Sequence, residues 1–251
     1  MSSVPNAPSQ QAELSTAKQK VVISKAQGEI FCLMLIEDAI PSSSDRNTMV
    51  MHAIRRAMQF VVGHTNVAQP ATVAKYVVAA MADVRRVFKQ YVFCHIHNEF
   101  GLHAGPDHPT PPVEHQAQRV VQLLNNFRYL CDPHNQESKF FSSSFFQTYI
   151  IDMLFLTPME LWKYVQNDNL DTVLALGGVA VTATLHNFRK GYLKEYEASA
   201  ALWRGSYLGI SQLIITMQGE LARKDWLMSF QPTLMAEGRA GLSLSTTNTS
   251  Q

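Results

Sequence analysis

The sequence predicts an all-α protein, a single globular bundle of about eight helices with buried central helices. Two segments are too apolar to lie on a surface, residues 140–156 (FFSSSFFQTYIIDMLFL) and 170–192 (LDTVLALGGVAVTATLHNFRKGY). Elsewhere, apolar residues recur every three or four positions, which is the spacing of one helix face. No run alternates apolar and polar residues as a half-buried strand would. The 251 residues are enough to bury a substantial core.

Composition divides the chain into three parts. Residues 1–18 are mostly Ser, Gln, Ala and Pro, and we expect them to form a disordered N-terminal tail. Residues 230–251 lack a clear helical period, and we expect a mobile C-terminal tail there. Residues 19–229 form the predicted all-helical domain, and they contain no internal repeat.

Three helices are predicted in the first part of this domain. Residues 19–40 have helical apolar spacing and end before Pro41, because proline pushes the preceding residue out of the α region. Residues 49–62 follow a Ser-Ser-Ser-Asp loop that can supply an N-cap. Pro70 suits the first turn of the third helix. Its apolar stripe, spaced by three and four, is Val73, Val77, Met81, Val84, Phe88 and Tyr91.

The remaining helices follow a predicted loop over residues 98–112, which contains two glycines and four prolines. Helices are expected over 113–131, from Ser143 onward, over 170–192 and over 196–221. A short helix is also expected from Pro158 to Val165. It begins with Thr-Pro-Met-Glu, in which the threonine can cap the helix and the glutamate can complete a capping box.

Charge and cysteine content indicate the compartment and the class of partner. The net charge is +1 and the isoelectric point is about 7.8, whereas nucleic-acid-binding domains usually exceed about 9, which argues against a nucleic-acid partner. Three cysteines near apolar runs fit free thiols in a reducing compartment. The start carries no secretory signal pattern, and the longest low-polarity stretch is shorter than a membrane span. We therefore expect a cytoplasmic or nuclear protein with no membrane association.

A cluster of histidines is the main candidate for a metal site. His95, His97, His103 and His108 lie close together in the sequence, and neutral imidazole is a common metal ligand. A zinc site needs three or four converging donors, but the spacing matches none of the strong metal motifs. The alternative is a polar loop that happens to contain histidines.

The glycine pair Gly177-Gly178 interrupts the apolar stripe of its helix. Each glycine inside a helix costs about 1 kcal/mol relative to alanine, so the pair needs a reason. One reason is a notch that lets a neighbouring helix approach closely. The other is a hollow that binds a small apolar ligand, which makes Gly177 and Gly178 candidate binding residues.

A few charged residues are weaker candidates. Asp152 lies on a nearly all-apolar helix and could act as an acid or base if it is buried, although a narrow solvated edge with Thr148 explains it equally well. Asp168 and Asp171 can cap the helix that follows. A basic patch would form if two helices bring together Arg55, Arg56, Arg85 and Arg86. Such charged residues usually lie on a solvent-exposed face of a helix.

Several stretches in a fixed order resemble a known family. They are KAQGEIFCLMLIEDAIPS, MADVRRVFKQYV, VVQLLNNFRYL, FFQTYIIDMLF and LALGGVAVTATLHNF, followed by the helix around Tyr207. In this order the chain resembles the domain of unknown function 6532 family, a fungal and mainly basidiomycete group. The resemblance covers residues 21–221. It implies an intracellular fungal protein with no assigned reaction, and it transfers no catalytic residue.

These observations favour a non-enzymatic interaction or scaffold protein of unknown partner that self-associates as a homo-oligomer or binds another protein. Charged residues make up only 16% of the chain, against about a quarter in typical domains, so we expect part of the surface to be covered. One alternative is a metal-dependent enzyme that uses the loop from His95 to His108. Another is a carrier of a small apolar ligand. The sequence leaves the cofactor unknown, and it assigns no catalytic residue.

Overall fold

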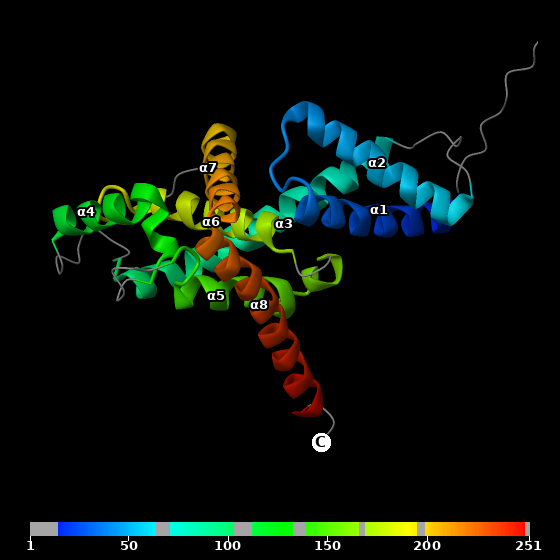
Figure 1. Ribbon diagram of the computed structural model, residues 1–251. Coiled ribbons are helices and arrows are strands. Elements are labelled where there is room, and N and C mark those ends of the chain that lie inside the picture. The colour runs from blue at the N-terminus through cyan, green and yellow to red at the C-terminus, as the bar shows by residue number, and fades with distance from the viewer. Residues whose placement is uncertain are drawn as a thin grey trace, which may run out of the picture. The chain divides into compact units, whose positions relative to one another are not determined.

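The computed structural model describes residues 15–63, 71–102, 112–132, 139–165, 169–194 and 199–248. Over these ranges the protein is all-α, as predicted, with eight α-helices and no strand (Figure 1). The helices are α1 (Thr16–Ile36), α2 (Ser43–Val62), α3 (Ala71–Phe100), α4 (Val113–Leu124), α5 (Ser144–Ile151), α6 (Asp171–Leu185), α7 (Ala200–Gly219) and α8 (Leu221–Asn248). Four short turns are η1 (Asn125–Leu130), η2 (Asp152–Leu156), η3 (Leu161–Tyr164) and η4 (His186–Phe188).

The chain divides into two compact units. The single domain expected over residues 19–229 stays a prediction. Unit 1 comprises Met1–Leu33 and Ser42–Met81, and unit 2 comprises Met34–Pro41 and Ala82–Gln251. The helices α1 and α3 each contribute residues to both units. A continuous helical stripe in the sequence cannot reveal such a division, because the period of the pattern does not change at the boundary.

Unit 1 contains α2, most of α1 and the start of α3. The predicted serine cap forms, since Ser42 Oγ accepts a hydrogen bond from Asp45 N at 3.2 Å and donates one to Asp45 Oδ2 at 2.6 Å. The helix therefore begins at Ser43, earlier than the predicted Met49. Gly63 ends it in the left-handed region, with φ of 79°. The buried face of α2 consists of Met49, Val50, Ala53, Ile54, Ala57 and Met58.

The core of unit 2 is built around α6, which confirms the prediction of buried central helices. Every residue from Thr172 to Leu185 is buried. The helices α5, α7 and α8 contribute further buried aromatic and aliphatic side chains, among them Phe146, Tyr149, Tyr207 and Phe230. Burial of this apolar surface is the main favourable contribution to folding of this unit.

Two predicted helices in unit 2 are wrong in their boundaries. The helix expected over 113–131 ends at Leu124, because Asn126 and Phe127 adopt left-handed backbone angles with φ of 49° and 55°. The predicted capping box does not form either. Thr157 Oγ1 donates to the Met153 carbonyl at 2.9 Å, and Glu160, itself at φ of 47°, pairs with Lys163.

The C-terminal region differs from the mobile tail predicted over residues 230–251. Instead, α8 continues to Asn248 and runs towards the C-terminal end in Figure 1. Its buried positions include Leu227, Phe230, Leu234 and Met235, which lie on both sides of the predicted boundary. Because packing against the rest of unit 2 stabilises α8, a weak helical period is sufficient there. At the other end of the chain, α1 already begins at Thr16, inside the predicted N-terminal tail.

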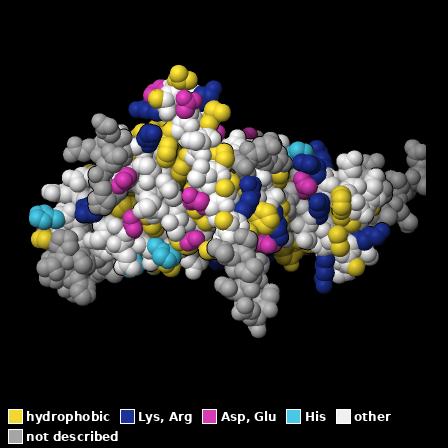
Figure 2. All heavy atoms as spheres, turned by 60° about the horizontal axis from the view of Figure 1, so that its bottom comes forward, with side chains coloured by type: hydrophobic (Ala, Val, Ile, Leu, Met, Phe, Trp, Pro, Cys, Tyr) yellow, Lys and Arg dark blue, Asp and Glu magenta, His cyan; other side chains and the backbone are white. Residues whose placement is uncertain are grey.

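The surface shows no membrane-spanning element, because none of the helices over the described ranges is both long and apolar enough to cross a bilayer. Hydrophobic side chains nevertheless reach the surface in several separate patches between charged ones (Figure 2). The most exposed large hydrophobic residues of unit 2 are Val121, Leu156, Leu208, Ile215, Leu221 and Met228. Those of unit 1 include Phe60 and Tyr76.

Candidate functional site

Half of the predicted metal site lies outside the described residues, namely His103 and His108. His95 and His97 lie on α3. Because residues two positions apart in a helix lie on nearly opposite sides, the two histidines do not share a face. The His95 ring stacks on Tyr91, and its Nδ1 donates to the Tyr91 carbonyl at 2.7 Å. Among the residues that the structure describes, no group of three His, Cys, Asp or Glu side chains could hold a metal ion. The metal site therefore stays a prediction.

The glycine pair of α6 lies against neighbouring side chains. A Cβ added to Gly177 would lie 2.5 Å from Ile150 Cδ1 of α5. A Cβ added to Gly178 would lie 2.7 Å from Ile210 Cδ1 of α7 and 3.5 Å from the Tyr129 hydroxyl. Contacts below 3.0 Å essentially never occur for a real Cβ, so the missing side chains allow α5 and α7 to approach α6 closely. The predicted ligand hollow at this pair stays a prediction.

Asp152 is brought together with one of the predicted histidines. It lies in η2, a single π-helical turn, and its Oδ2 accepts a hydrogen bond from the Tyr91 hydroxyl. The Tyr91 ring stacks with the His95 ring at a centroid distance of 4.3 Å and with the Tyr149 ring at 5.3 Å. Single π-helical turns are frequent at functional sites. The hydrogen bond from Tyr91 orients the Asp152 carboxylate beside these stacked rings.

Four phenols in unit 2 should resist ionisation at alkaline pH. Burial raises the pKa of Tyr129, Tyr149 and Tyr207, and burial together with the hydrogen bond to Asp152 raises the pKa of Tyr91. Each phenol has a higher pKa in the folded state than its unfolded pKa of about 10. The folded state therefore keeps its full stability below the unfolded pKa, and it loses stability as the pH rises through the folded pKa. We expect these phenolates to appear in an absorbance titration only as the protein unfolds. Ordinary titration of all four in the folded protein would contradict this.

The four arginines of the predicted basic patch divide between the units. Arg55 and Arg56 belong to unit 1, where Arg56 forms an ion pair with Glu29 at 3.2 Å. Arg85 and Arg86 belong to unit 2. The two arginine pairs therefore belong to different units. The combined patch stays a prediction.

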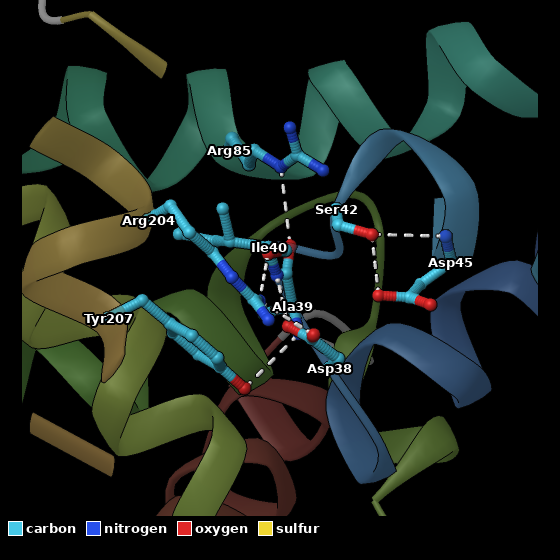
Figure 3. Close-up of polar contacts among 8 residues, drawn as sticks. All are labelled: Asp38, Ala39, Ile40, Ser42, Asp45, Arg85, Arg204 and Tyr207. Atoms are coloured by element: carbon cyan, nitrogen blue, oxygen red, sulfur yellow. Dashed lines mark hydrogen bonds and ion pairs between the residues drawn. The ribbon is translucent and has the colours of Figure 1, made fainter. Parts of the chain in front are cut away.

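A polar network that sequence reasoning missed surrounds residues Asp38, Ala39 and Ile40 in unit 2 (Figure 3). Arg204 of α7 forms an ion pair with Asp38 at 2.7 Å and donates a hydrogen bond to the Ile40 carbonyl. Arg85 Nε of α3 donates to the Ala39 carbonyl at 3.3 Å.

The same segment also binds Tyr207, the second α7 residue in Figure 3. Its hydroxyl accepts a hydrogen bond from Ala39 N at 3.3 Å. The Arg204 guanidinium lies 5.8 Å from the centre of the Tyr207 ring, within the range of a cation–π contact. Because most of these bonds go to backbone groups, the network fixes the path of the chain between α1 and α2. We call residues Asp38, Ala39, Ile40, Arg85, Arg204 and Tyr207 the arginine clasp.

A pocket of about 460 Å³ opens in unit 2 at the start of α6. Its polar lining comes from three helices or their ends, through Asn169, Asp171, Gln218, Lys224 and Gln231. The volume is within the ordinary range for small-molecule sites. Nothing in the sequence links these positions, which span more than sixty residues.

The exposed side of α7 carries a regular stripe without charge. Its members follow one another at spacings of four, three, four, three and four: Ala201, Gly205, Leu208, Gln212, Ile215 and Gly219. All six are exposed, and the two large ones, Leu208 and Ile215, are 51% and 58% exposed. The opposite side of the helix is buried through Tyr207, Ile210, Ile214 and Met217. We call these six exposed residues the α7 seam.

The glycines of the α7 seam have no role in packing within the described part of the chain. A Cβ added at Gly205 or Gly219 would meet nothing within 4 Å. In the interior of a helix, glycine costs about 1 kcal/mol relative to alanine. The only charged residue of α7 is Arg204, which is engaged in the arginine clasp. The spacing of the seam is visible in the sequence. The sequence does not show which side of α7 is exposed, because both sides are apolar.

The comparison with known proteins identifies one family. Its description is Domain of unknown function (DUF6532), and its profile matches residues 25–217, well over half of the chain. The match includes α2 to α6 in full, most of α1 and most of α7. No curated protein and no solved structure matches the chain.

Proposed function

Because the chain belongs to the family described as Domain of unknown function (DUF6532), which assigns no activity, we propose a function from the surface of unit 2. The protein is a non-enzymatic interaction or scaffold protein of the cytoplasm or nucleus that self-associates through the α7 seam. The single observation that carries this proposal is the exposed, uncharged stripe from Ala201 to Gly219.

The spacing of the stripe supports a helix as the partner surface. Alternating steps of four and three keep side chains on one narrow face, as in the seam of two helices packed side by side. From Ala201 to Gly219 the seam extends over about 27 Å at 1.5 Å per residue. Leu208 and Ile215 supply apolar area, and the glycines let another backbone approach closely.

The absence of charge on the seam supports a second copy of this chain as the partner. In a twofold-symmetric dimer the same patch meets itself, so any charge at its centre would face a like charge. In an antiparallel pair centred on the middle of the seam, Gly205 faces Ile215 of the partner subunit. A small residue then lies opposite a large one, which is the arrangement that close helix packing needs.

The test measures the mass of the protein in solution over a series of concentrations. We expect the wild type to form a dimer and the double variant Leu208→Glu, Ile215→Glu to be monomeric, because four carboxylates would meet in the interface. The matched control is Val121→Glu, Leu156→Glu, which adds the same charge at exposed apolar positions outside α7. We expect this control to remain dimeric.

Two results would refute the proposal. One is a monomeric wild type at every concentration, and the other is a control variant that dissociates as completely as the α7 variant. Circular dichroism of each variant should match the wild type, since all four substituted side chains are exposed. This measurement separates a loss of the interface from a loss of the fold.

A further inference from the structure

The pocket at the start of α6 presents an anion held by neutral donors. The Asp171 carboxylate accepts hydrogen bonds from Gln231 Nε2 at 2.6 Å and from Gln218 Nε2 at 2.8 Å, one on each oxygen. Gln231 is only 8% exposed, and its Oε1 accepts from Leu170 N at 2.8 Å, which sets the direction of its amide. Each Asp171 oxygen retains a further lone pair that can accept a hydrogen bond.

The pocket also presents a cation. Lys224 of α8 lines the same pocket as Asp171. Within the described ranges, its ammonium group forms no ion pair, while its neighbour Arg223 is paired with Glu220. The pocket therefore offers one negative and one positive group, and neither is neutralised by a charged side chain of the described residues.

A backbone acceptor lies in the wall of the pocket. Pro232 stands inside α8 and has no N–H, so it cannot donate the helical hydrogen bond to the carbonyl of Met228, four residues earlier. Both residues line the pocket. The Met228 carbonyl thus lacks its usual helical donor, and Met228 is one of the residues that line the pocket. Asn169 also lines the pocket, and its Oδ1 accepts a hydrogen bond from Asp171 N at 3.0 Å. The apolar part of the wall consists of Leu227, Met228 and Pro232.

We propose that this pocket binds a small zwitterion, an α-amino acid with an apolar side chain. The ligand ammonium group is placed at Asp171 and the Met228 carbonyl, and its carboxylate is placed at Lys224. The apolar side chain packs against Leu227 and Pro232. Charge-assisted hydrogen bonds of this kind are stronger than neutral ones, so both charged ends contribute to selection of the ligand.

The test compares three probes by calorimetry with the purified protein: L-leucine, L-leucinamide and N-acetyl-L-leucine. We expect L-leucine to bind, and each of the other two to bind at least about ten-fold more weakly, because each lacks one charged end. Leucinamide keeps the ammonium group, and N-acetyl-leucine keeps the carboxylate. Absence of L-leucine binding would overturn the proposal.

Two variants test which residue recognises which end. Lys224→Met should bind leucine and leucinamide with similar affinity, and Asp171→Asn should no longer discriminate between leucine and N-acetyl-leucine. Lys190→Met removes an exposed lysine outside the pocket and should bind like the wild type. The proposal would also be overturned if Lys224→Met bound leucine as tightly as the wild type. Lys224 is exposed, so this variant provides a test even if Asp171→Asn proves unstable.

Discussion

Gly178→Leu is expected to destabilise unit 2 by roughly 3 kcal/mol, the upper end of the usual range for overpacking and a large part of the stability of a typical domain. The Cβ alone would lie 2.7 Å from Ile210 Cδ1, and leucine adds three further carbon atoms in the same fully buried place. The Tyr129 hydroxyl, which donates to the Gly178 carbonyl at 2.8 Å, would also be displaced. The measurement is the free energy of unfolding by urea, followed by circular dichroism.

The matched control for this variant is Gly241→Ala. Gly241 is also helical, but an added Cβ would meet nothing within 4 Å. We expect this variant to be as stable as the wild type or slightly more stable, because alanine is the better helix former. If Gly178→Leu keeps the stability of the wild type, α6 has room beside its glycine pair. The ligand hollow would then become the better interpretation of Gly177 and Gly178.

Arg204→Met is expected to lower the free energy of unfolding by about 2–3 kcal/mol. Methionine retains most of the apolar stem of arginine, so the loss reports on the guanidinium group. That group pairs with Asp38, whose side chain is only 23% exposed, and hydrogen-bonds the Ile40 carbonyl. Both partners would remain part-buried without it. Urea unfolding again provides the measurement.

Arg223→Met is the control for the arginine clasp. Its partner is Glu220, and both side chains of this pair are about half exposed. Exposed pairs contribute between 0 and about 1 kcal/mol, so we expect little change in stability. Equal effects of the two substitutions would show that the clasp contributes no more than an ordinary surface ion pair.

Helices were predictable here wherever one face is apolar and the other polar. The stripe from Val73 to Phe88 is buried as its spacing indicated. The prediction failed where backbone angles departed from helical values without proline, as at Asn126 and Phe127. It failed also in α8, where Pro232 and two glycines hide the period and packing against unit 2 supports the helix.

The candidate sites were less predictable than the helices, because they depend on residues that are distant in the sequence. Asp152 was identified from its apolar surroundings, but its partner Tyr91 lies 61 positions earlier. The arginine clasp joins Asp38 to Arg204 across 166 positions. No local pattern records such pairs, so only the fold could bring them together.

The sequence by itself determined the fold class, the family and the positions of most helices, because these depend on local periodicity and on the order of short motifs. Only the tertiary structure decided which side of α7 is exposed, which side chains fill the space beside Gly177 and Gly178, and which polar groups meet at Asp171. The physical reason is that α6 and α7 are apolar on nearly all sides. For such helices the direction of burial depends on the neighbours, and the period of the sequence does not specify it.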